Sequence, residues 1–164
     1  MAVTLWLVRH AKAVDQPPPG GRDRDRTLAS RGEAEAAALA EFLESSTLHL
    51  PPTVLVSPAA RTHATAATAF RSLPREALVT ESRLYDATDD EVLSIVGEHA
   101  GLGTSIGVVG HNPTIGLLID ALAPPVDEAA RRCPPGTLAV ISLPAGDLGS
   151  IELGTGVLEV HRTP

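Results

Sequence analysis

The chain has 164 residues, of which 43% are hydrophobic and 2% are aromatic, and its formal net charge at pH 7 is −7. We expect one domain over 1–164 whose core is filled by Leu, Val, Ile and Ala. The acidic balance argues against nucleic acid as a partner, although a local cluster of Arg and His can bind a small phosphorylated ligand. A single cysteine excludes an internal disulfide, and no apolar stretch suits a signal sequence or a membrane span. We therefore expect a cytoplasmic protein with no membrane partner.

The first predicted element is a buried strand over 4–8, which has apolar side chains on both faces. Arg9 and His10 follow it directly. Ligands bind at the carboxyl ends of the strands in an open α/β sheet, so this pair is a candidate anion pocket that contains a nucleophile. A Pro- and Gly-rich loop with mixed charges follows over 16–26. We interpret its charged part as solvated, or alternatively expect Arg26 to reach the rim of the pocket.

The next predicted elements are a helix that begins at Ser30 and a strand over 53–56. Ser30 and Glu33 match the capping-box pattern, and an apolar stripe follows at helical spacing (Ala36, Leu39, Ala40 and Leu43). The strand is a short apolar run that ends before Ser57.

A second helix is predicted over 58–72, with Ser57 as its N-cap and Pro58 at its first position. Arg61 lies in its first turn, close to the carboxyl end of the preceding strand. The free N–H groups and the dipole of a helix N-terminus favour anions, and an arginine there adds to the effect. The alternative interpretation places Arg61 on a solvated face of the helix.

Two more strands, over 77–80 and 106–109, alternate with a helix that the capping-box pair Thr88 and Glu91 opens. His111 follows the second of these strands directly, at its carboxyl end. Both a structural and a functional role are open for a histidine in this position. Strands that alternate with helices predict an α/β fold with a mostly parallel sheet.

The last third of the chain carries weaker patterns. Asn112 is predicted to cap a helix with a regular apolar face (Ile115, Leu118, Ile119 and Leu122). A weak helical turn over 126–132 and a strand over 137–143 follow. A final pair over 150–153 and 156–161 is typical of a hairpin or of edge strands.

Arg9, His10, Arg61 and His111 all follow strands, and the carboxyl ends of parallel strands lie at one edge of a sheet. Phosphoryl transfer suits this set. Neutral His10 can attack phosphorus to form a covalent phosphohistidine, while the two arginines hold the phosphoryl oxygens and a protonated His111 offsets their charge. This chemistry needs no metal, and the sequence has neither a compact metal-ligand spacing nor a P-loop. We therefore expect no metal and no cofactor.

Three motifs, LVRHA (7–11), SPAART (57–62) and GHNP (110–113), together resemble those of the histidine phosphatase (phosphoglycerate mutase-like) superfamily. The short chain and the Arg-His-Ala-Lys-Ala form resemble its small SixA-type phosphohistidine phosphatase branch. The resemblance implies a three-layer α/β/α domain, with His10 as nucleophile and the other three strand-end residues as the phosphate pocket. It also implies a phosphorylated protein or a small phosphorylated molecule as partner.

The general acid is the main departure from the family pattern. Larger members carry a Glu after the third strand, and Glu81 is the nearest candidate here. Two other functions stay open: a phosphate-binding or interaction module without turnover, and a phosphomutase. A mutase needs a lid to exclude water, for which only the loop over 16–26 is available. The sequence leaves the substrate and the oligomeric state open.

Overall fold

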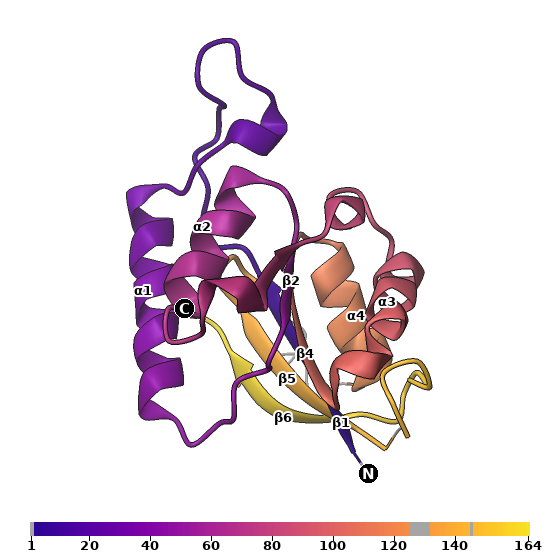
Figure 1. The fold of residues 1–164 in the computed structure, drawn as a ribbon. Helices are drawn as coiled ribbons and strands as arrows, with labels where there is room; N and C mark the ends of the chain where they lie inside the picture. The colour runs from indigo at the N-terminus through magenta and orange to yellow at the C-terminus, as the bar shows by residue number, and fades with distance from the viewer. Residues whose placement is uncertain (1, 125–131, 145) are drawn as a thin grey trace.

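The computed structural model describes residues 2–124, 132–144 and 146–164, and Figure 1 shows its fold. A six-stranded sheet has the strand order β3-β2-β4-β1-β5-β6. Helices cover both of its faces (Figure 1). In chain order the strands are β1 (Val3–Arg9), β2 (Val54–Val56), β3 (Leu78–Thr80), β4 (Ser105–Gly110), β5 (Leu138–Leu143) and β6 (Val157–Arg162).

The parallel part of the sheet sets the position of the site. Strands β3, β2, β4 and β1 are parallel, whereas β5 and β6 add to the edge beside β1 in antiparallel orientation. Arg9 pairs in register with Gly110, and Val56 pairs with Val109. The carboxyl ends of β1, β2 and β4 are therefore side by side, and the predicted mostly parallel α/β sheet is confirmed.

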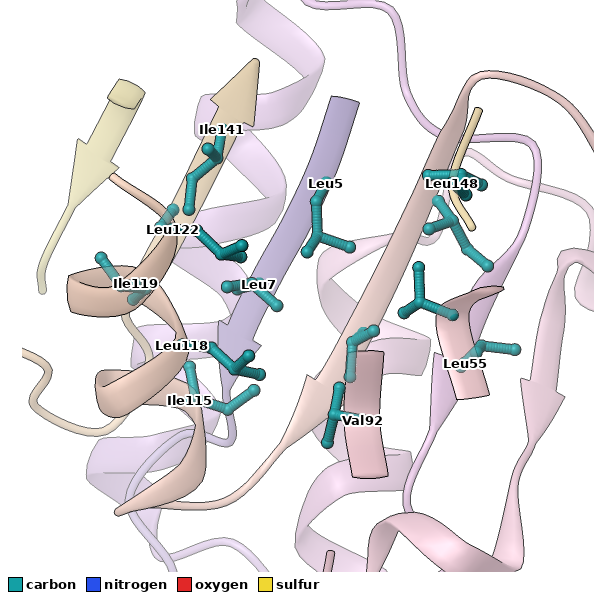
Figure 2. Close-up of a cluster of buried hydrophobic side chains, with 14 of the residues drawn as sticks. Leu5, Leu7, Leu55, Val92, Ile115, Leu118, Ile119, Leu122, Ile141 and Leu148 are labelled. Atoms are coloured by element: carbon teal, nitrogen blue, oxygen red, sulfur yellow. The ribbon is translucent and has the colours of Figure 1, made fainter. Parts of the chain in front are cut away.

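The helices form the outer layers, because β1 is buried on both faces and presents alternate side chains to each. On one face α1 (Ser30–Ser45) and α2 (Ala60–Ala69) pack in a cluster with Trp6 and Val8. On the other face α3 (Asp89–Glu98) and α4 (Thr114–Leu122) pack in a cluster with Leu5 and Leu7. Figure 2 shows the second cluster, in which Leu118 and Leu122 of α4 face β1. The predicted three-layer arrangement is confirmed.

The helix α1 begins at Ser30 as predicted, but the predicted N-cap is wrong. Ser30 is the first helical residue and Ala29 is the N-cap, with no side-chain cap hydrogen bond. The cause is tertiary, since the backbone N–H of Ala29 donates to the carbonyl of Lys12 at 2.9 Å and fixes Ala29 in an extended conformation. The capping box of Thr88 and Glu91, by contrast, is confirmed.

The caps of α2 and α4 also differ from the prediction. The N-cap of α2 is Ala59, so Ser57 and its following proline precede the helix. The N-cap of α4 is Pro113, although the side chain of Asn112 still accepts a hydrogen bond from the backbone N–H of Gly116 at 3.3 Å. A polar residue before a proline was a correct signal for a helix start, but one to two residues early in each case.

The C-terminal expectations are confirmed in part. β5 and β6 correspond to the strands predicted over 137–143 and 156–161. Residues 150–153 are not a strand, and β6 pairs with β5 instead. Most of the helical turn expected over 126–132 lies outside the described residues. Within the described part of the chain, no helix combines the length and the apolar character that a membrane crossing requires.

Candidate active site

His10 follows the last residue of β1 and is 9% exposed. Its Nδ1 lies 2.8 Å from the carbonyl oxygen of Ala11, which can only accept, so Nδ1 carries the hydrogen. The lone pair of Nε2 consequently faces Arg61, whose Nε–H donates to it at 3.3 Å. Burial, together with the nearby guanidinium groups, lowers the pKa of His10 to about 4. At neutral pH the ring is uncharged and its Nε2 is available as a nucleophile.

The backbone after His10 is held from two sides. The N–H of Ala11 donates to the hydroxyl of Thr65 at 3.0 Å. Gly32 of α1 packs against Lys12 so closely that a Cβ at this position would lie 2.0 Å from the Lys12 carbonyl oxygen. These contacts fix the direction of the His10 ring relative to α2, and they explain why a glycine is needed near the start of α1.

Arg61 is the second residue of α2 and is 5% exposed. The predicted position near the end of β2 is confirmed, and the alternative of a solvated helix face is wrong. Besides its contact with His10, its Nη2 lies 3.5 Å from Nδ1 of His111. The guanidinium therefore bridges the two histidines, whose ring centroids are 5.3 Å apart.

His111 follows β4 and is oriented by Ser57. Its Nε2 lies 2.7 Å from the hydroxyl of Ser57, which is fully buried at the end of β2. Because Arg61 approaches Nδ1 as a donor, Nδ1 is the acceptor and Nε2 carries the hydrogen that is donated to Ser57. Burial, followed by the influence of His10 and Arg61, lowers the pKa of His111 to about 3.

We expect Ser57→Ala to lower kcat/KM for phosphate release by roughly tenfold, because it leaves the Nε2–H of His111 without an acceptor in a buried place. Steady-state kinetics on one phosphorylated substrate would measure the change. Ser105→Ala is a matched control, because the Ser105 hydroxyl is buried and has no hydrogen-bond partner among the described residues. Equal activity of the two variants would contradict the role of Ser57.

Arg9 ends β1 and completes the cluster. Its Nη1 donates to the carbonyl of Cys133 at 2.8 Å, whereas its buried Nε has no hydrogen-bond partner among the described residues. A buried N–H without a partner is costly, so the group is suited to donate to a bound oxyanion. Arg9, His10, Arg61 and His111 thus line one cavity of about 350 Å³, together with Arg26, Asp23 and Tyr85.

Arg26 lines the cavity, in agreement with the alternative expectation that it reaches the rim of the pocket. Its Nη1 donates to the carbonyl of Val14 at 3.2 Å, and its Nε lies 3.0 Å from the carboxylate of Asp23. The guanidinium is thus held by the loop to which it belongs. It adds positive charge to the lining of the cavity.

The structure does not bring Glu81 into this cavity. Its carboxylate binds Arg83, at 3.0 Å to Nε and 2.8 Å to Nη2, and accepts from the Arg83 backbone N–H. The hydrogen bonds from Arg83 hold the pKa of Glu81 at about 2. A carboxylate that is ionised at neutral pH and engaged by a neighbouring arginine has no proton to donate. The expectation that Glu81 is the general acid therefore has no support in this geometry.

Sequence reasoning missed Ser57 and Asp23 at the site, and it left open whether Tyr85 belongs to the core or to the pocket wall. Ser57 was interpreted as a helix cap, although its position at a strand end next to Pro58 was a usable signal. Asp23 lines the cavity from a loop in which no local pattern marks it, and Tyr85, which follows a short turn after β3, lies in the pocket wall.

The sequence model of the histidine phosphatase superfamily (branch 1) matches residues 5–92, which include His10 and Arg61. The chain belongs to this superfamily. This histidine phosphatase is 30% identical to the uncharacterised protein Rv1276c of Mycobacterium tuberculosis, an alignment that covers 96% of this chain and 99% of that protein.

Solved structures place this histidine phosphatase in the SixA-type branch. It shares 30% identity and a TM-score of 0.82 with a Nakamurella multipartita protein provisionally named phosphohistidine phosphatase SixA, covering 100% of this chain and 97% of the other. A protein from Agrobacterium tumefaciens with the same provisional name has 27% identity and a TM-score of 0.78, with 99% of each chain covered. The chain is accordingly a phosphatase with a phosphoglycerate mutase-like fold.

Proposed function

We propose that this phosphatase acts without a metal, through a covalent phosphohistidine on His10. The observation that carries the proposal is the orientation of His10, whose Nδ1–H is tied to Ala11 and whose Nε2 lone pair faces the cavity beside Arg61. A neutral imidazole in this tautomer is a nucleophile that needs no separate base. The burial that lowers its pKa keeps it neutral at pH 7.

In the first step Nε2 of His10 bonds to phosphorus while the bond from phosphorus to the leaving group breaks. The guanidinium groups of Arg9 and Arg61 bind the equatorial oxygens. His111 becomes a donor to these oxygens only after it gains a proton at Nδ1, and the charge of an incoming dianion favours that protonation. In the second step water attacks phosphorus, the bond to Nε2 breaks, and His10 returns with phosphate released.

The proposed substrate class is a phosphohistidine on a protein, with an exposed phosphomonoester as the alternative. Two features support this order. The names of the two relatives from Nakamurella and Agrobacterium point to phosphohistidine. Two carboxylates line the cavity: Asp23 is bound by Arg61 and Tyr85, and Asp86 is exposed, so the lining holds no buried carboxylic acid to protonate an alkoxide leaving group. A phosphoramidate leaving group needs less help than an alkoxide.

We expect phosphate release in the presence of a chelator, with a kcat/KM at least about tenfold higher on a phosphohistidine protein than on alkyl phosphomonoesters. The measurement compares both substrate classes at equal phosphate concentration. An activity that disappears with the chelator and returns with a divalent cation would contradict the metal-independent mechanism. A preference for a small alkyl phosphate would contradict the proposed substrate class and leave the mechanism standing.

A further inference from the structure

The side chain of Asp23 binds the same edge of Arg61 that an oxyanion would use. Arg61 Nη2 donates to the Asp23 carboxylate at 3.0 Å, and Arg61 Nη1 donates to the Asp23 carbonyl oxygen at 2.9 Å. Because Nε already donates to His10, each of the three guanidinium nitrogens has an acceptor within the chain. A phosphoryl group that takes two hydrogen bonds from Arg61 therefore competes with Asp23.

The loop that carries Asp23 has a fixed base and a separate tip. The base is closed by a β-bridge between Ala13 and Leu28. The tip contains the short turn η1 (Asp23–Asp25) and belongs to the loop that extends from the top of the molecule in Figure 1. Outside the loop, the Asp23 side chain contacts Arg61 and Tyr85, whose hydroxyl donates to the carboxylate at 2.5 Å.

Burial decides which partner can move. The side chain of Asp23 is 57% exposed, whereas that of Arg61 is 6% exposed. The carboxylate can pass into water with little change in its hydration, but the guanidinium is enclosed by α2 and the two histidines. Arg26 pairs with Asp23 at 3.0 Å, but its guanidinium is also held by the carbonyl of Val14 near the base of the loop, so the carboxylate gives up this contact too when it moves away.

We propose that Asp23 is an internal competitor for the oxyanion site, which occupies Arg61 in the empty enzyme and leaves with η1 when substrate binds. This inference rests on the proposed function, because it takes Arg61 as the phosphate ligand. Asp23 then determines the affinity of the site: the apparent dissociation constant equals the intrinsic one divided by the fraction of molecules in which Arg61 is free. The same factor applies to every oxyanion that displaces the carboxylate.

The test is calorimetric titration of the phosphate-free protein with tungstate, a tetrahedral dianion, and with perrhenate, its monoanionic counterpart. We expect Asp23→Ala to raise the affinity for both ions by a common factor of about ten. We expect a smaller factor for Asp23→Asn, because its amide oxygen can still accept from Arg61. Asp25→Asn is the matched control: it removes one charge from the same turn, and its amide oxygen can still accept from the Arg22 N–H. We expect it to change either affinity by less than about twofold.

Unchanged or weaker binding of both ions by Asp23→Ala would overturn the inference. A gain for tungstate that greatly exceeds the gain for perrhenate would also overturn it, because the carboxylate would then repel the ion from nearby instead of leaving. Arg61→Ala separates this failure from that of the proposed function. If tungstate binding does not depend on Arg61, the proposed phosphate site itself is wrong; if it does, only the role of Asp23 is rejected.

Discussion

Replacement of His10 by Gln is expected to lower kcat for phosphate release by at least about a thousandfold, because the nucleophile is removed while a polar side chain remains beside Arg61. The wild-type enzyme, mixed rapidly with labelled substrate, should carry phosphate in a linkage that is labile in acid and stable in base, as expected for a phosphorus–nitrogen bond. The variant should carry none. Quench-flow labelling and steady-state phosphate release measure the two effects.

His63→Gln is the matched control for this prediction. His63 lies on α2, two residues after Arg61, but its side chain is exposed and does not line the cavity. We expect the control to keep wild-type activity and labelling. Turnover that survives in His10→Gln would show that the central residue is misassigned. A variant that is inactive but still labelled would place the phosphoryl group on another side chain.

Arg61→Lys is expected to lower kcat/KM by about a hundredfold to a thousandfold at unchanged charge. The guanidinium reaches His10, His111 and the cavity from one rigid plane, with Nε at 3.3 Å from His10 and Nη2 at 3.5 Å from His111. An ammonium group offers a single donor centre and cannot hold two phosphoryl oxygens while it also spans the two rings. The loss should therefore appear in kcat as well as in KM.

Arg71→Lys is the control for the arginine substitution. Arg71 also forms a two-point ion pair, with Glu44 at 2.7 Å for both contacts, but on the exposed surface. We expect unchanged kinetics and little change in the free energy of unfolding, because ion pairs on the exposed surface contribute little to stability. Denaturant unfolding of Arg61→Lys shows whether its lower activity comes from lost structure. Near-wild-type kinetics of a folded Arg61→Lys variant would mean that the site requires only a positive charge, and not the several N–H donors of the planar guanidinium.

Local sequence patterns determined the sheet and the ends of its strands. Apolar runs marked β1, β2 and β4, and Arg9, His10, Arg61 and His111 followed these runs closely. Since parallel strands place their carboxyl ends at one edge, the convergence of these four side chains was predictable without coordinates. The same patterns could not give the antiparallel direction of β5 or its place beside β1, because strand direction depends on the path of the connecting chain.

Tertiary structure decided which side chains are engaged at that edge. Ser57 looked like a cap in the local sequence, yet it is bonded to His111, 54 residues away. Asp23 carries no local signal, yet it binds Arg61, 38 residues away. Glu81 follows β3 as the family pattern suggests, but its neighbour Arg83 holds it outside the cavity. The sequence by itself thus determined which strand ends carry the functional residues. Which hydrogen bonds they make depended on how loops and strand ends approach one another in space, because a polar side chain binds the partner that packing brings within reach.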